Sequence, residues 1–132
     1  MFAEVAVDEA LGMVRVRRVT GVYDVGTLLN EKTGKSQLIG GIVWGVGLAL
    51  HEETHIDSRN GRTVNNNLAE YHMPVNLDIG EIDVMALGIP DKNFNDLGAR
   101  GIGARWADRG VGGRVGRRAD TAGGGWLLGF NG

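Results

Sequence analysis

One long helix is predicted by the stretch EKTGKSQLIGGIVWGVGLALHEE, residues 31–53. Apolar residues recur in it every three or four positions, which is the spacing of one buried helix face. They are Leu38, Ile42, Gly45 with Val46, and Ala49 with Leu50. Asn30 is a good N-cap for a helix that starts at Glu31, and Ser36 would cap a later start. The stretch therefore predicts a helix with one face against a core.

Four glycines lie in this predicted helix after Ser36, at positions 40, 41, 45 and 47. Each glycine lowers helix stability by about 1 kcal/mol relative to alanine. Glycines also let another backbone or a ligand come close, because they carry no Cβ. Four of them in one helix therefore indicate close packing against a second backbone or against a bound group.

The segments around the helix carry strand patterns. Apolar and polar residues alternate over 2–7 and again over 13–17, which predicts a β-hairpin with its turn at 8–12. Residues 81–87 predict a further strand, and Asn-Gly within 57–61 predicts a tight turn. A β-hairpin, one long glycine-rich helix and a further strand predict an α+β fold, not a series of βαβ units.

Length and composition limit the chain to one small domain. It has 132 residues, a mass of 14.1 kDa and no cysteine, so disulfides, thiolate metal sites and a cysteine nucleophile are excluded. The net charge of -2 gives no general attraction to nucleic acid or to an anionic membrane. The longest apolar run, residues 38–50, is shorter than the roughly 20 residues that cross a bilayer. We therefore expect neither nucleic acid nor a membrane as a partner.

The composition changes near residue 103. Residues 104–132 hold 9 of the 23 glycines, with five arginines and two aspartates, and form a basic tail. No periodic pattern follows residue 103, and the arginines are not interleaved with aromatic residues in a nucleic-acid-binding motif. We therefore expect residues 104–132 to be an irregular, disordered tail.

One short motif points to a different function. His51, Glu52 and His55 match H-E-x-x-H, which on a helix places two imidazoles on one face for zinc and a glutamate beside a bound water. Glu70 or Glu81 would then be the third ligand. The motif falls in the last turn of the predicted helix, so His55 is not expected to be helical. A small zinc metallohydrolase is therefore the alternative function, beside two polar histidines at a helix end.

Several blocks of sequence occur in the order and at the spacings of one known family. They are FAEVAVD (2–8), GMVRV (12–16), DVGTLLN (24–30), SQLIGGIVWGVG (36–47), LHEE (50–53), NLAEYHMP (67–74) and GARGIG (98–103). Together they resemble the molybdenum hydroxylases, the large molybdopterin-binding subunits of xanthine dehydrogenases and aldehyde oxidases. The resemblance implies that residues 1–103 are the C-terminal part of the second molybdopterin-binding domain.

The resemblance also implies a cofactor-binding site. The glutamine of the family's Q-x-x-G-G helix contacts the pterin cofactor, and this role carries over to Gln37. The backbone of the family's glycine loop approaches the metal and the pterin, and this role carries over to Arg100, Gly101, Ile102 and Gly103. A glutamine amide both donates and accepts hydrogen bonds, which suits a pterin edge, and glycines let N–H groups reach an anionic ligand. No side chain of the chain is expected to be catalytic or to bind metal.

The implied parent enzyme hydroxylates aldehydes or N-heterocycles with oxygen derived from water. Its cofactor would be molybdenum–molybdopterin, in the cytosine dinucleotide form. Its partners would be the rest of the large subunit together with iron–sulfur and FAD subunits or domains, in the cytoplasm or, for the parent complex, the periplasm. The other cofactor contacts lie upstream of Phe2, so we expect the chain alone to be inactive and not to hold the cofactor. A non-catalytic remnant that pairs with the upstream polypeptide is a third possibility.

The resemblance stops at one residue. The family has a glutamate general base directly after the loop, and this sequence has Ala104 followed by Arg105. Loss of a positioned general base costs roughly 10²–10⁴-fold in rate. An Ala-Arg pair encoded GCG-AGA contains the glutamate codon GAG out of frame. We therefore hypothesise a shift of reading frame near codon 104, which would also account for the composition of residues 104–132.

Overall fold

The computed structural model describes residues 1–102 and the backbone of the strand at 126–129. The elements, in chain order, are β1 (Phe2–Asp8), β2 (Met13–Tyr23), α1 (Glu31–Leu50), β3 (Ile56–Asp57), β4 (Arg62–Thr63), β5 (Glu81–Ala86) and β6 (Trp126–Gly129). The predicted α+β fold is confirmed. The hairpin, the helix and the further strand all lie where the sequence predicts them, within a few residues at their ends.

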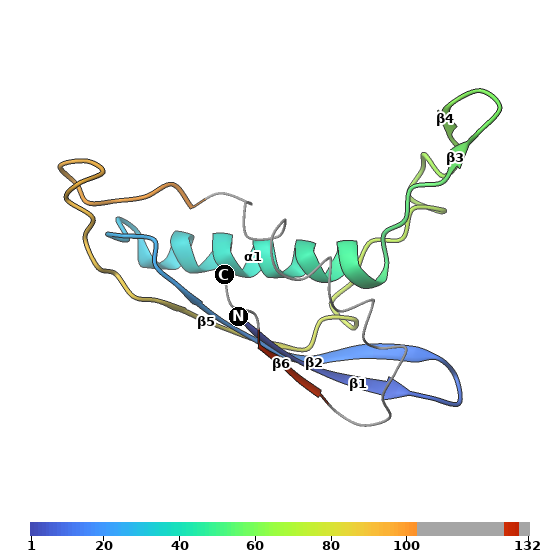
Figure 1. The fold of residues 1–132 in the computed structure, drawn as a ribbon, viewed down its shortest axis with the longest axis horizontal. Coiled ribbons are helices and arrows are strands. Elements are labelled where there is room, and N and C mark those ends of the chain that lie inside the picture. The colour runs from blue at the N-terminus through green and yellow to red at the C-terminus, as the bar shows by residue number, and fades with distance from the viewer. Residues whose placement is uncertain (103–125, 130–132) are drawn as a thin grey trace.

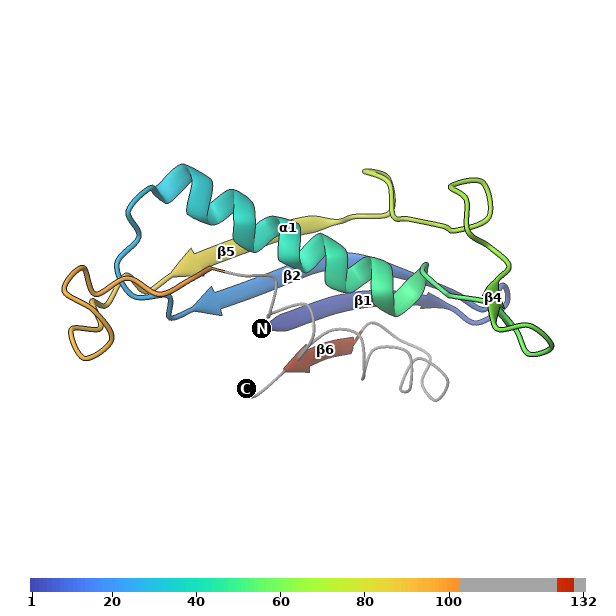
Figure 2. The same cartoon turned by 90° about the horizontal axis from the view of Figure 1, so that it is seen from above.

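Four strands form one sheet in the order β5-β2-β1-β6, and α1 lies across one face of it (Figures 1 and 2). β1 is antiparallel to β2 and to β6, whereas β2 and β5 are parallel. The segment from β2 through α1 to β5 is therefore a single parallel crossover. Neither this pairing nor the strand β6 was predicted from the sequence.

The β1–β2 hairpin is closed by local polar contacts. The Asp8 carboxylate accepts hydrogen bonds from the backbone N–H groups of Ala10 and Leu11, at 3.0 and 3.1 Å. Gly12 follows with φ +63°, a conformation that glycine adopts without strain. These contacts turn the chain so that Asp8 pairs with Met13, and the hairpin has the register its alternating pattern requires.

The helix begins at the first predicted N-cap and ends earlier than predicted. The Asn30 side chain accepts a hydrogen bond from the N–H of Thr33 at 3.0 Å, so Asn30 and not Ser36 caps α1. At the other end, the N–H groups of His51 and Glu52 both donate to the carbonyl of Gly47, at 2.9 and 2.8 Å. This convergence ends the helix at Leu50, before the predicted end at residue 53.

The core lies between α1 and the sheet. The buried face of α1 consists of Gly34, Leu38, Ile42, Gly45, Val46 and Gly47. Ile42 packs with Ala3 and Val19, and Leu38 packs with Tyr23 and Val25. Full burial of one such aliphatic side chain is worth roughly 1.5–3 kcal/mol. The helix is thus fixed on β1 and β2 by the apolar spacing that predicted it.

The four helix glycines that follow Ser36 divide into two pairs. Gly45 and Gly47 are buried, and a Cβ on Gly47 would lie 2.9 Å from Pro74. In contrast, a Cβ added to Gly40 or Gly41 would meet no atom of another part of the chain within 4 Å. Close packing within the chain therefore accounts for Gly45 and Gly47 only. For Gly40 and Gly41, the predicted alternative of a bound group remains.

A small hairpin extends beyond the C-terminal end of α1 (Figure 1). β3 and β4 pair across the turn predicted at 57–61, and Gly61 has φ +69°. Below it, the buried side chain of Asn65 donates to the carbonyl of Glu53 at 2.6 Å and accepts from the N–H of His55 at 2.9 Å. We call residues 52–80 the arm.

Over the described residues, no helix is long and apolar enough to span a bilayer.

Candidate cofactor-binding site

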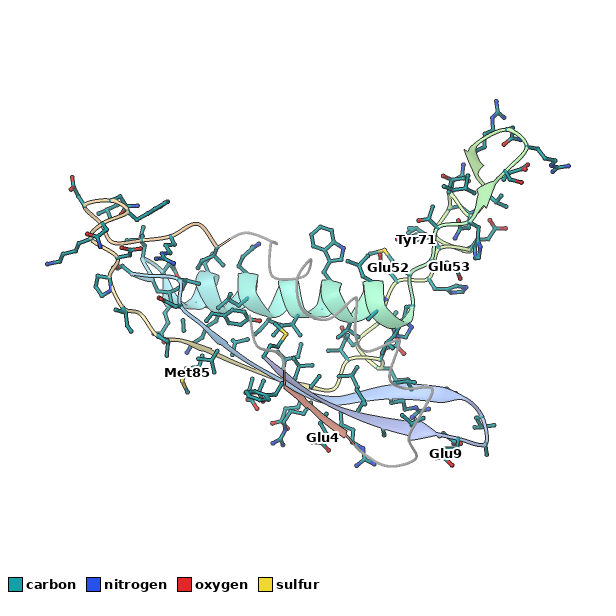
Figure 3. The ribbon with its side chains drawn as sticks, viewed as in Figure 1. Glu4, Glu9, Glu52, Glu53, Tyr71 and Met85 are labelled. Atoms are coloured by element: carbon teal, nitrogen blue, oxygen red, sulfur yellow. The ribbon has the colours of Figure 1, made fainter. Side chains whose placement is uncertain are left out.

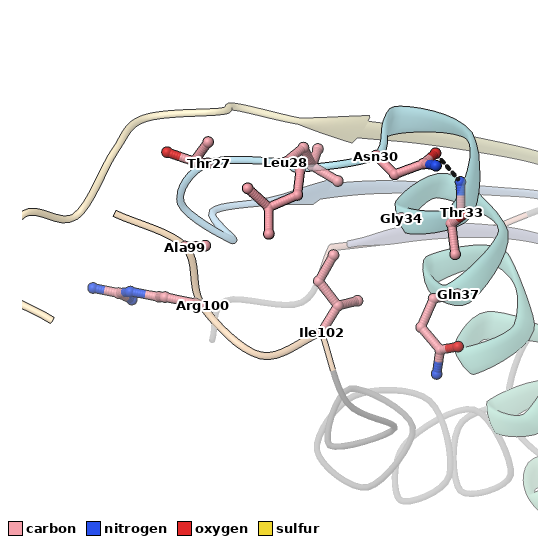
Figure 4. Close-up of a pocket in the computed structure, with 10 residues that line it drawn as sticks. Thr27, Leu28, Asn30, Thr33, Gly34, Gln37, Ala99, Arg100 and Ile102 are labelled. Atoms are coloured by element: carbon pink, nitrogen blue, oxygen red, sulfur yellow. Dashed lines mark hydrogen bonds between the residues drawn. The ribbon is translucent and has the colours of Figure 1, made fainter. Parts of the chain in front are cut away.

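A pocket lies at the N-terminal end of α1, where the chain from β2 enters the helix (Figure 4). Its volume is about 340 Å³. Its walls are Thr27, Leu28, Leu29, Asn30, Thr33, Gly34 and Gln37 from one segment, and Ala99, Arg100 and Ile102 from another. Small-molecule sites commonly have volumes of about 300–1,000 Å³, so this pocket is large enough for a ligand group.

The second wall is held against the first by backbone hydrogen bonds. Thr27 N–H donates to the carbonyl of Gly98 at 2.8 Å, and Arg100 N–H donates to the carbonyl of Val25 at 3.1 Å. Gly26 lies between them in an isolated bridge with Ala99. Gly26 has φ +67°, and a Cβ there would collide with the carbonyl oxygen of Gly98. Glycine at 26 is therefore what lets the two segments approach so closely.

Gln37, from α1, and Ile102, from the loop at 98–102, both line this pocket (Figure 4). Gln37 is exposed and extends from α1 one turn after Gly34. A Cβ on Gly34 would collide with Leu28 and would lie 3.4 Å from the Ile102 side chain. The missing side chain at position 34 thus makes room for Leu28, whereas Ile102 is at ordinary contact distance. Among the described residues, the Gln37 amide has no hydrogen-bond partner, so it can donate and accept hydrogen bonds in the pocket.

The Arg100 guanidinium is paired with a carboxylate of its own loop. Its Nε lies 3.0 Å from Asp91 Oδ2, its Nη2 bonds the same oxygen, and in Figure 4 its side chain extends away from Gln37. The guanidinium lowers the pKa of Asp91, and the carboxylate in turn raises the pKa of Arg100. The loop therefore offers a ligand its backbone N–H groups and not a free arginine side chain.

Three of the predicted site residues line one pocket. Gln37, Arg100 and Ile102 all belong to its wall, although more than 60 residues of chain separate the helix residue from the loop. Gly101 joins Arg100 to Ile102 and is exposed, and a Cβ there would meet nothing within 4 Å. Gly103, the fifth predicted residue, and Ala104 lie outside the described residues.

Other residues of this site were missed by the sequence analysis. Thr27 and Thr33 line the pocket, and Asp91 and Asn95 hold the loop that forms its second wall. Asn30 was identified only as a helix cap. The available signal was local: Asn95 and Asp91 are side chains that commonly bond nearby backbone in loops, directly before a glycine-rich segment.

The H-E-x-x-H motif does not form the site that the zinc alternative requires. α1 ends at Leu50, so His51 is its C-cap and His55 lies beyond the helix. The Glu52 carboxylate accepts a hydrogen bond from the Tyr71 hydroxyl at 2.8 Å, on the arm side of the helix (Figure 3). Among the described residues, no three histidine, cysteine, aspartate or glutamate side chains gather closely enough to hold a metal ion. The prediction that His55 lies outside the helix is thus confirmed, and the described residues do not form the site that the zinc alternative requires.

The residues present fit part of a pterin cofactor. Gln37 supplies one donor and one acceptor, as a pterin edge requires. Around Gly101 there is open space, and no described residue accepts a hydrogen bond from the N–H of Gly101 or Ile102. Two successive free N–H groups can bind an anionic group. Gly40 and Gly41 leave further open surface on the same helix.

The chain is thus an α+β domain with a ligand-sized pocket at the N-terminal end of its helix. Residues 1–80 match the family described as the molybdopterin cofactor-binding domain. The chain belongs to this family, which is that of the oxidoreductases of the xanthine dehydrogenase and aldehyde oxidase type. Gln37 lies within the matched residues, and the loop at 98–102 follows them.

The relatives are much longer than this chain. It is 43% identical over 102 residues to the aldehyde oxidoreductase molybdenum-binding subunit PaoC of Escherichia coli K12, covering 77% of this chain and 14% of that protein. It is 38% identical over 82 residues to the xanthine dehydrogenase molybdenum-binding subunit of Escherichia coli O157:H7, covering 62% and 11%. Quinoline 2-oxidoreductase from Pseudomonas putida 86 has the same fold, with a TM-score of 0.67 and 30% identity, over 80% of this chain and 14% of that one.

Proposed function

We propose that residues 1–103 supply one wall of the molybdenum-cofactor site in a molybdenum hydroxylase. The observation that carries the proposal is the shared pocket of Gln37, Arg100 and Ile102 at the N-terminal end of α1. The family match and the identity to molybdenum-binding subunits support it. The chain would act together with the remainder of the large subunit, because it spans only 14% of PaoC.

Each residue would have a distinct role. The Gln37 amide would orient the cofactor by donating and accepting hydrogen bonds along one edge. The N–H groups of Gly101 and Ile102, together with the next residue, Gly103, would donate to anionic or carbonyl groups. Arg100 would act through its backbone carbonyl, since its side chain is bonded to Asp91 and its N–H donates to Val25. The bound molybdenum–pterin group would supply the redox chemistry, which no side chain of this chain can supply.

The substrate class and the partners follow by analogy with the relatives. The names aldehyde oxidoreductase, xanthine dehydrogenase and quinoline 2-oxidoreductase support a parent enzyme that hydroxylates aldehydes or N-heterocycles with water-derived oxygen. We further propose the cytosine dinucleotide form of the cofactor, and iron–sulfur and FAD partners that remove the electrons. The parent complex would be located in the cytoplasm or the periplasm.

We propose that the chain alone is inactive. By the resemblance, Ala104 would occupy the family's general-base position, so the chain would lack that base. A shift of reading frame near codon 104 would explain this residue together with the composition of the tail. Sequencing the gene tests that idea: an alternative frame that encodes glutamate and an alanine-rich helix supports it. A gene with neither overturns it.

A chimera tests the cofactor wall directly. Residues 1–102 of this chain would replace the matching segment of PaoC, leaving the host sequence that follows it. We expect the chimera to retain molybdenum, and Gln37→Ala in the chimera to lower the molybdenum content about fivefold, the effect of one lost hydrogen bond of about 1 kcal/mol. Lys35→Ala, an exposed helix position paired only with Glu31, is the control.

Two results would overturn the proposal. One is a chimera that folds and assembles but holds no molybdenum. The other is an unchanged molybdenum content after Gln37→Ala. The isolated chain is a second test: stoichiometric molybdenum with aldehyde oxidation by residues 1–132 would contradict the proposed dependence on the rest of the subunit.

A further inference from the structure

The loop between β5 and the pocket is held by side-chain hydrogen bonds of its own, in addition to the backbone bridge to residues 25–27. Asn95 Nδ2 donates to the carbonyl of Ala99 at 2.7 Å, and Asn95 Oδ1 accepts from the N–H of the same residue at 3.1 Å. One side-chain amide thus binds both backbone groups of one residue. That residue is the first of the pocket's second wall.

Asp91 fastens the loop one step further along. It bonds the Arg100 guanidinium through Oδ2, and its N–H donates to the carbonyl of Gly98 at 3.0 Å. Gly98 has φ +62°, and a Cβ there would lie 2.8 Å from Pro90. The carbonyl of Gly98 also accepts from Thr27, so three segments of chain meet at this one oxygen.

These contacts restrain the residues before Gly101 on both sides. Asn95 holds Ala99, Asp91 holds Arg100, and Val25 accepts the N–H of Arg100. The peptide groups of Gly101 and Ile102 follow directly, and their N–H groups meet no acceptor among the described residues. The direction of these two N–H groups therefore depends on the positions in which Ala99 and Arg100 are held.

We propose that Asn95 and Asp91 are positioning residues that hold the 98–102 loop in its ligand-binding shape before any ligand arrives. This inference rests on the proposed function for the identity of the ligand. The restraint of the loop by Asn95 and Asp91 does not rest on the proposed function, because it consists of contacts within the chain. A ligand that meets a loop already in shape does not have to offset the entropy of ordering it.

Amide hydrogen exchange on the full 132-residue chain tests, without any cofactor, whether Asn95 restrains the loop. In Asn95→Ala we expect the amides of Ala99 and Arg100 to exchange about tenfold faster, because two hydrogen bonds to Ala99 are lost. Asn95→Asp keeps an acceptor for the Ala99 N–H, so that amide should remain within about twofold of the wild-type rate. Asn93→Ala is the matched control, since the Asn93 side chain makes no contact of this kind among the described residues.

The core amides of β1 and β2 report whether each variant is folded. Equal exchange at Ala99 in Asn95→Ala and Asn93→Ala, with a protected core, would overturn the inference. So would loss of Ala99 protection in Asn95→Asp as complete as in Asn95→Ala.

The PaoC chimera separates this inference from the proposed function. We expect Asn95→Ala to lower its molybdenum content about fivefold and Asn93→Ala to leave it unchanged. A wild-type chimera without molybdenum contradicts the proposed function and leaves the exchange result standing. A chimera that keeps its molybdenum after Asn95→Ala, despite faster exchange, contradicts the positioning role.

Discussion

The two ends of α1 are held in different ways. At the N-terminal end, Gly26, Gly34 and Gly98 let three segments approach until backbone and side chains interlock around the pocket. At the C-terminal end, Pro74 of the arm lies against Gly47, and within the arm the Tyr71 hydroxyl donates to Glu52. Leu77, in the arm, is 94% exposed. The N-terminal end of α1 is thus held by contacts among several segments of the chain. The C-terminal end depends on contacts with residues near it in the sequence.

The largest effect is expected at the pocket end, from Gly26→Ala. A Cβ at 26 would have a positive φ and would collide with the Gly98 carbonyl, so we expect a loss of about 3 kcal/mol in the free energy of unfolding. Gly61→Ala in the arm is the control, because φ is also positive there but no atom lies within 4 Å of the new Cβ. It should cost about 1 kcal/mol. Equal losses in urea unfolding would remove the distinction between the two ends.

The next effect is at the arm, from Asn65→Ala. This side chain is 6% exposed and bonds the backbone of Glu53 and His55, so its loss removes the hydrogen-bond partner of two backbone groups. We expect a cost of about 2 kcal/mol, felt mainly by the arm. Limited proteolysis should then cut within residues 52–80 sooner, while the strands β1 and β2 stay protected. Faster cleavage near residue 100 as well would mean that the two ends are coupled.

Gly40→Ala should have a smaller effect of opposite sign. Nothing crowds this exposed helix position, so alanine should stabilise the chain by about 1 kcal/mol in thermal unfolding. In the PaoC chimera the same methyl group would enter the surface that we assign to the cofactor, and the molybdenum content should fall. A stabilised chimera with unchanged molybdenum would show that Gly40 faces no ligand.

The smallest effect concerns pH. The pKa of Asp91 is lowered by Arg100, and the pKa of Asp57, in the arm, is lowered by Arg59. A carboxylate with a lowered pKa stabilises the folded chain above its unfolded pKa of 3.8, and this contribution disappears as the pH falls through the lower folded value. Asp91→Asn should therefore flatten the stability profile below pH 4 more than Asp57→Asn does, because Asp57 and Arg59 are sequence neighbours in any state.

The elements of the fold could be predicted because their patterns are local. Alternation marked β1, β2 and β5, and the four-residue apolar spacing marked α1. The helix end was misplaced because it depends on two N–H groups that meet at the carbonyl of Gly47. The strand β6 has four residues and exists by pairing with β1, so no periodicity could reveal it.

The site was only partly accessible from sequence. Gln37, Arg100 and Ile102 were found through a family resemblance, and no spacing between positions 37 and 100 could have indicated that they share a pocket. Asp91 and Asn95 were missed because their partners, Arg100 and Ala99, are fixed by how the loop folds. The open space at Gly40 and Gly41 is likewise a property of the folded chain, whereas the sequence shows only that both are glycines.

The parallel pairing of β2 with β5 has a consequence for how the chain folds. Arg18 and Glu81 are joined across it by an ion pair at 2.6 Å, although 63 positions separate them in the sequence. Closing so long a segment costs entropy that grows with its length, and contacts of this kind slow folding. We expect the β1–β2 hairpin and α1 to form first and β5 to join last, which pulse-labelling of amides during refolding would detect. The pocket would then be completed at the end of folding, because its second wall follows β5.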